Sequence, residues 1–126
     1  MAKYYTLVPL PQGDFEKLSL VDRAVFGMIW ERYKLSSYKL LGGDDRWYDH
    51  DRDELFCIFA HEELARLVGV SEKTIRRSLK VLRDEAHMIS WEKAGFMGAC
   101  RYYVSEEARA TMHSLKQNSK DEDKSP

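Results

Sequence analysis

Cysteine is scarce in this chain, which has only Cys57 and Cys100 among its 126 residues. The two lie too far apart for a CxxC metal or redox site, and each sits in a stretch that resembles a β-strand. We therefore expect two reduced cysteines in the core. The alternative is a disulfide formed on oxidation, if the fold makes their two strands neighbours.

The chain also lacks long apolar runs and a signal peptide. No stretch approaches the length of a membrane span, and the N-terminus lacks the basic, apolar and small-residue sections of a secretory signal. These absences predict a cytoplasmic protein that does not associate with a membrane.

Signatures of catalysis and of cofactor binding are missing as well. There is no phosphate-binding glycine loop, and no histidine stands in a recognisable arrangement with serine, cysteine or metal-binding neighbours. The histidines are His50, His61, His87 and His113. We expect neither an enzyme nor a cofactor.

The composition suits one compact domain, because 44% of the residues are hydrophobic and 12% are aromatic. The proline-punctuated start YYTLVPLP predicts an extended arm over residues 1–18, and the folded domain should span 19–104. A C-terminal helix is expected over 105–117. The polar end NSKDEDKSP predicts a disordered tail over 118–126.

The stretch from His61 to Val104 has the pattern of a helix, a glycine turn, a second helix and a β-hairpin. Gly69 is suited to end the first helix in a left-handed conformation, and Ser71 is a natural N-cap for the second. The second helix should run from Glu72 to Ala86. Apolar residues repeat at helical spacing in both helices, as Leu64, Ala65 and Val68 and then as Ile75, Leu79, Leu82 and Ala86. We predict a mainly α fold with a small β-sheet, an α+β winged helix-turn-helix.

Positive charge is concentrated on the second helix. Helical rotation places Lys73, Arg77 and Lys80 opposite its apolar face, with Arg76 and Arg83 on the flank. The whole chain has a formal net charge of only -1, so this surface is not the trivial result of a basic composition. A solvated helix face is the alternative, but the glycine turn, the serine cap and the hairpin favour insertion into the DNA major groove.

The predicted hairpin, or wing, pairs Met88–Glu92 with Arg101–Val104 around a turn that contains Gly95 and Gly98. Lys93 and Arg101 are candidates for contacts to DNA phosphates. The tip between the strands is apolar, with Phe96 and Met97. It is either an interface, a wedge for the minor groove, or a turn folded back on the body, and the last is the commonest in proteins.

Two further elements are expected upstream. Ser19 should cap a helix, with Asp22 completing a capping box, and the broad apolar surface of that helix favours the core, with a dimer contact as the alternative. Two strands should follow around Trp47–Tyr48 and Leu55–Phe59, and one of them should pair with the wing. The acidic stretch between them is expected to be a solvated turn. A metal site is the weaker alternative, since the spacing of Asp49, His50, Asp51 and Asp53 is not that of a calcium loop.

The order of the motifs YYTLVPLP, LSLVDRAVFGMIWERYKLS and RWYDHDRDELFCIFAHEELARLVGVSEKTIRRSLKVLRDE resembles the N-terminal domain of plasmid replication initiators of the RepA_N family from Gram-positive bacteria. The resemblance covers about Tyr4 to Val104. It implies a winged-helix domain that binds repeated origin sequences in double-stranded DNA, commonly as a homodimer, and that works with other replication proteins. The residues that match the recognition helix are Ser71, Lys73, Thr74, Arg76, Arg77 and Lys80.

The chain departs from the family pattern in two respects. The wing tip AGFMGA carries no charge, whereas the family tends to have basic residues there. Such initiators also continue into a second domain, so this domain either belongs to a longer protein or acts alone. The predicted function is DNA binding by a replication initiator. A winged-helix transcriptional repressor is the first alternative, and a protein-interaction module on the same scaffold is the second.

Overall fold

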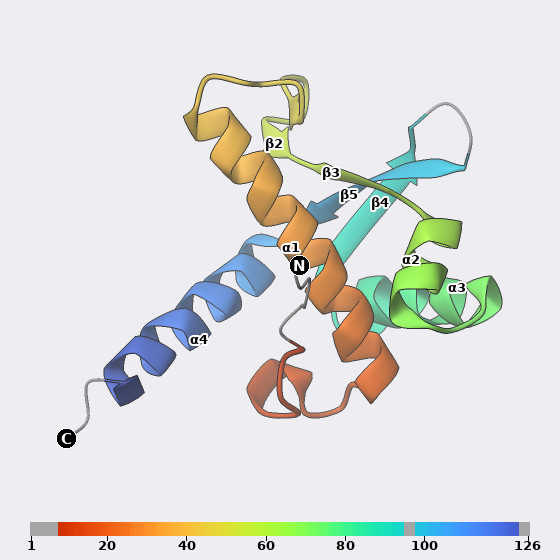
Figure 1. Ribbon diagram of the computed structural model, residues 1–126, viewed down its shortest axis with the longest axis vertical. Coiled ribbons are helices and arrows are strands. Elements are labelled where there is room, and N and C mark those ends of the chain that lie inside the picture. The colour runs from red at the N-terminus through yellow and green to blue at the C-terminus, as the bar shows by residue number, and fades with distance from the viewer. Residues whose placement is uncertain (1–7, 95–97, 124–126) are drawn as a thin grey trace, which may run out of the picture.

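A computed structural model describes residues 8–94 and 98–123 of the protein. Helix α1 (Leu20–Leu41) runs through its middle (Figure 1). A short 3-10 helix, η1 (Gly13–Phe15), precedes it. The remaining elements follow in the order β1 (Tyr48–Asp49), β2 (Glu54–Leu55), β3 (Cys57–Ala60), α2 (His61–Val68), α3 (Glu72–Lys80), the π-helical turn η2 (Val81–Glu85), β4 (Ile89–Lys93), β5 (Ala99–Val104) and α4 (Glu106–Asp123).

The start of α1 is fixed by the capping box that the sequence predicts. The Ser19 hydroxyl accepts a hydrogen bond from the Asp22 N–H at 3.1 Å, and the Asp22 carboxylate accepts one from the Ser19 N–H at 3.2 Å. These two bonds satisfy amides that would otherwise have no partner at the helix start. The helix is central to the core, because its buried side chains are Val25, Phe26, Ile29, Trp30, Tyr33 and Ser36.

Strands β3, β5 and β4 form a three-stranded antiparallel sheet in that order. Tyr102 in the middle strand lies opposite Cys57 on one side and Trp91 on the other. The pairing of β3 with β5 confirms that an upstream strand joins the wing. Strands β1 and β2 form a separate two-stranded ladder that closes the acidic turn.

The sheet register separates the two cysteines, both of which are buried and reduced. Cys57 lies opposite Tyr102, whereas Cys100 lies opposite Phe59, so the cysteines are diagonal neighbours on one face. Diagonal Cβ atoms in a sheet are typically about 7–8 Å apart, and a disulfide needs about 3.5–4.5 Å. The prediction of reduced core cysteines is therefore confirmed, and the register does not support the alternative of a disulfide on oxidation.

Two helix ends differ from the sequence-based expectation. The second helix does not continue as an α-helix to Ala86, because the Ala86 N–H bonds to the Val81 carbonyl at 3.0 Å and makes a π turn after Lys80. Helix α4 continues to Asp123, past the end at residue 117 that the sequence predicts, and residues 124–126 lie outside the described part. The stretch contains no glycine or proline before residue 126, and nothing in it stops a helix that has already begun.

The predicted N-terminal arm contributes to the core over its second half. Phe15 and Leu18 are almost completely buried beside α1, and the Pro9 carbonyl accepts a hydrogen bond from Arg23 at 2.9 Å. Residues 1–7 lie outside the described part of the chain. Across the residues that are described, no helix combines the length and hydropathy of a membrane span.

Candidate nucleic-acid interface

The turn between α2 and α3 has the geometry that its sequence predicts. Gly69 adopts φ 85° and ψ 32°, and its N–H donates to the Ala65 carbonyl at 2.8 Å, which closes the end of α2. A left-handed backbone of this kind favours glycine. Ser71 then caps α3, since its hydroxyl accepts a hydrogen bond from the Thr74 N–H at 3.1 Å.

Helix α3 has one buried face and one cationic face. Ile75, Leu79 and the following Leu82 are completely buried, as the apolar spacing predicts. The other face carries four exposed cations, Lys73, Arg76, Arg77 and Lys80. None of the four forms an ion pair within the described ranges 8–94 and 98–123. We call these four side chains the cationic face of α3.

The hydroxyls of Ser71 and Thr74 take part in the helix cap. Besides the capping bond, the Ser71 and Thr74 hydroxyls lie 3.0 Å apart and share a hydrogen bond. Their main role in this structure is therefore to set the start of α3. Any contact of these hydroxyls with a DNA phosphate would use the hydrogen-bonding capacity that the cap leaves on each oxygen.

A hydrogen bond that sequence reasoning missed ties α3 to the start of α1. Ser78, which is 3% exposed, donates its hydroxyl hydrogen to the Asp22 carboxylate at 2.6 Å. Asp22 is the same residue that completes the capping box of α1. One carboxylate therefore fixes the start of the central helix and the position of α3 against it.

A second connection holds α2. Arg32 of α1 donates two hydrogen bonds to the Glu63 carboxylate, at 2.8 and 2.9 Å, and a third to the Ile58 carbonyl at 3.1 Å. Its guanidinium also lies 3.6 Å from the centre of the Phe59 ring. The hydrogen bonds from Arg32 lower the pKa of Glu63 below its usual value. Arg32 thus anchors both the sheet and the first helix of the motif to α1.

The wing presents its two predicted phosphate-binding residues on opposite faces. Lys93 pairs with Cys100 in the sheet register, and directly opposite residues share a face. The Cys100 sulfur lies 3.8 Å from the His61 ring at the start of α2, so Lys93 is on the same face of the sheet as the helices. Burial lowers the pKa of His61, and the charge of Arg76 lowers it further. His61, at the start of α2, therefore lies between Arg76 of α3 and the paired Cys100 and Lys93 of the wing.

Arg101 points to the other face of the sheet. Its guanidinium lies 3.9 Å from the Asp49 carboxylate and 4.6 Å from the centre of the Phe56 ring. Because alternate residues of a strand face opposite sides, Arg101 cannot join Lys93 on one surface. Of the two residues, only Lys93 therefore shares a face of the wing with the helices. Arg83, which the sequence places on the flank of the cationic helix, is also not free, since it forms an ion pair with Asp84 at 2.7 Å and stacks on Trp91.

The apolar wing tip, Phe96 and Met97, lies outside the described residues. The strands that flank it are closed by a hydrogen bond of 2.9 Å from the Ala94 N–H to the Ala99 carbonyl. The acidic turn before β2 is described in full, and its Asp49 accepts hydrogen bonds from the Tyr103 hydroxyl and from two backbone amides. No cluster of side chains suited to a metal ion occurs among the residues that the structure describes.

Comparison with solved structures supports the assignment of the fold. Three similar chains have the descriptions "N-Terminal domain of DNA binding protein", "Structure of Rep-DNA complex" and "Structure of MDR initiator". Each is 12% identical in sequence, with TM-scores of 0.56, 0.56 and 0.57. The matches cover 92%, 92% and 90% of this chain and 88%, 89% and 90% of the others. The chain has an α+β winged-helix fold, as the sequence predicts.

The sequence comparisons find no counterpart. No known family profile matches the chain, and no curated protein matches it.

Proposed function

We propose that the chain binds double-stranded DNA through the cationic face of α3, as the DNA-binding domain of a plasmid replication initiator of the RepA_N type. The observation that carries this proposal is the set of four exposed cations without ion pairs in the described structure, on a helix whose opposite face is fully buried. A helix held in this way by a preceding helix and a glycine turn is the unit that enters the major groove. The three similar structures support it, because the descriptions of two of them name DNA and that of the third names an initiator.

The proposed contacts divide into two kinds. Arg76 and Arg77 are long enough and flexible enough to reach base edges, and an arginine pairs with guanine through two hydrogen bonds. Lys73, Lys80 and Lys93 approach the phosphates as point charges, which fixes the register without reading sequence. Arg101 is not part of this set, because it is paired on the far face of the wing.

The proposal is tested with the triple variant Arg76→Ala, Arg77→Ala, Lys80→Ala. All three side chains are exposed, so the variant should fold normally, while binding to duplex DNA should be lost at physiological salt. Single removal of the arginine that reads a base should cost about 1–3 kcal/mol and relax the sequence preference. Unchanged DNA binding by the triple variant would overturn the assignment. A matched control is Arg66→Ala on the exposed side of α2.

The initiator role is tested by footprinting on the DNA around the coding region. Tandem direct repeats, occupied one domain per repeat, are expected for an initiator. A single palindrome over a promoter would instead identify a repressor on the same scaffold. We also propose a homodimer on adjacent repeats, which analytical ultracentrifugation with and without a two-repeat duplex would detect.

A further inference from the structure

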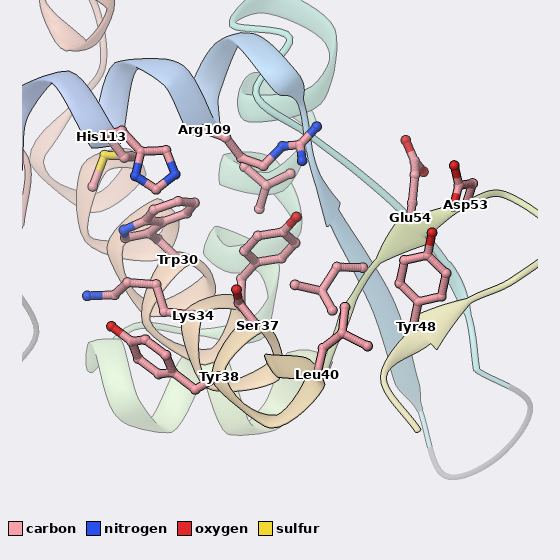
Figure 2. A pocket seen from close by; sticks show the side chains of 14 residues that line it. Trp30, Lys34, Ser37, Tyr38, Leu40, Tyr48, Asp53, Glu54, Arg109 and His113 are labelled. Carbon is pink, nitrogen blue, oxygen red and sulfur yellow. The ribbon is translucent and has the colours of Figure 1, made fainter. Parts of the chain in front are cut away.

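A cavity of about 390 Å³ lies between the C-terminal half of α1, the β1–β2 ladder and the first turns of α4 (Figure 2). Helix α4 leaves on the opposite side of α1 from α2 and α3, so the cavity is separate from the cationic face of α3 (Figure 1). Its size falls in the range of sites for small ligands, which is about 300–1,000 Å³.

The walls of the cavity are mainly aromatic and aliphatic. Trp30 stacks on Tyr33 with 5.7 Å between ring centres, and His113 of α4 meets the Trp30 ring edge-on. Tyr38 of α1 and Tyr48 of β1 add two further rings around the opening. Tyr38 is 59% exposed, which leaves a large aromatic surface uncovered at the mouth. Such a lining binds an apolar body.

Arg109 lines the cavity beside Tyr33, and one of its donor atoms lacks a partner. Its Nε atom is buried and has no hydrogen-bond acceptor among the described residues. The guanidinium lies beside the Tyr33 hydroxyl, where burial raises the pKa of the phenol and Arg109 offsets part of that rise. Burying a donor without an acceptor is unfavourable, so a ligand oxygen that accepts a hydrogen bond from this guanidinium would offset part of the cost of burying it.

Of the two cations in the lining, Lys34 and Arg109, only Arg109 is without an ion pair among the described residues, so it is the group that would hold a negative charge on a ligand. Lys34 pairs with Glu31 at 3.0 Å, and Glu54 pairs with Arg52 at 3.0 Å. Arg109 forms no ion pair within the described residues. Asp53 and Glu54 stand across the opening from Arg109 (Figure 2) and disfavour a polyanion such as a nucleic acid. A ligand with a single carboxylate on an apolar body places one negative charge beside Arg109 and brings no further negative charge near Asp53 and Glu54.

We propose that this cavity binds a carboxylate joined to an apolar body. The carboxylate accepts hydrogen bonds from Arg109, whose planar guanidinium matches carboxylate geometry, and the apolar body lies among Trp30, Tyr38 and Tyr48. Two sources supply this chemistry: a free aryl or alkyl carboxylic acid, and the C-terminal carboxylate of an apolar peptide. The inference does not depend on the proposed DNA contact.

The test uses 4-phenylbutyrate as the probe and 4-phenylbutanol as its uncharged match. Titration of the whole chain, followed by amide NMR shifts and by tryptophan fluorescence, should show saturable binding of the acid with shifts at residues of α1, α4 and the β1–β2 ladder. Arg109→Gln should raise the Kd for the acid about tenfold and leave the weaker binding of the alcohol unchanged. The matched control, Arg66→Gln on α2, should bind the acid normally.

A second pair of probes distinguishes the sources. Acetyl-Leu-Phe-Leu with a free carboxylate is compared with the same peptide as an amide. Binding of the acid peptide more tightly than 4-phenylbutyrate identifies a peptide terminus, and the reverse order identifies a small acid. If circular dichroism shows that Arg109→Gln is unfolded, Tyr38→Ala takes its place. Tyr38 is exposed, and its removal should weaken the binding of 4-phenylbutyrate. Equal affinity for acid and alcohol, or shifts confined to other parts of the chain, would overturn the proposal.

Discussion

The Asp22 carboxylate of α1 accepts a hydrogen bond from the Ser78 hydroxyl of α3 at 2.6 Å, across 56 positions of sequence. The same carboxylate accepts from the Ser19 N–H in the capping box. Ser78 is buried between the cationic face of α3 and the core, so this bond sets how α3 sits on the central helix. Asp22 and Ser78 are positioning residues for the proposed DNA contact.

Ser78→Ala should lower the free energy of unfolding by about 1–3 kcal/mol, because it leaves a partly buried carboxylate oxygen without its donor. Urea denaturation measures the loss. Asp22→Ala and the double variant complete a thermodynamic cycle, in which the two single losses should not add. Additive losses would mean that the bond contributes nothing to stability.

The connection between Asp22 and Ser78 shows what the sequence could and could not predict. The capping box, the glycine turn and the buried stripe of α3 depend on neighbours within a few positions, so local patterns predicted them. Ser78 is a small polar residue among the apolar positions of α3. No residue near it in the sequence indicates that its partner lies in α1. The π turn after Lys80 also escapes prediction, because Leu79 and Leu82 face the core in either type of helix.

The faces on which Lys93 and Arg101 lie follow from the alternation of side chains along the two strands of the wing. Trp91 and Tyr102 are strand residues whose side chains belong with the core, and Lys93 lies two positions from Trp91. Arg101 lies one position from Tyr102 and must therefore face the other way. The alternation of side chains carries this information once the register is known, but the register depends on residues distant in sequence.

Gly69→Ala should destabilise the protein by about 1–2 kcal/mol, the usual cost of a left-handed backbone for a residue with a Cβ atom. A Cβ at this position would meet no atom within 4 Å, so the cost comes from the backbone at φ 85° and not from a clash. Thermal or urea unfolding measures it. Gly69→Asn is the matched control and should cost less, since asparagine tolerates this conformation. Equal stability of the alanine variant and the native chain would contradict the assigned turn.

The ion pair of Glu63 with Arg32 should make stability depend on acid pH. Hydrogen bonds from Arg32 lower the pKa of Glu63 in the folded protein. The stabilisation is therefore complete above the usual glutamate pKa of about 4.3 and is lost as the pH falls through the lower folded pKa. Glu63→Gln should lose roughly 1 kcal/mol at pH 7, because both side chains are about one third exposed and partly screened. The difference from the native chain should shrink below about pH 4. A difference that is constant from pH 7 to pH 3 would contradict this origin.

Lys93→Ala and Arg101→Ala form a matched pair that tests which face of the wing meets DNA. Lys93 is exposed on the face of the wing that carries the helices, so its removal should weaken binding to all duplex sequences alike and reduce the salt slope by about one. Arg101 contacts Asp49 and Phe56 on the far face, so its removal should leave affinity and slope unchanged and lower the melting temperature instead. Fluorescence anisotropy across a salt series measures both quantities. Because the two cations stand in adjacent strands, one position out of register with each other, equal losses of DNA affinity would mean that the wing lies edge-on to the phosphates. A loss confined to Lys93 would mean that only the helix-facing side of the sheet approaches them.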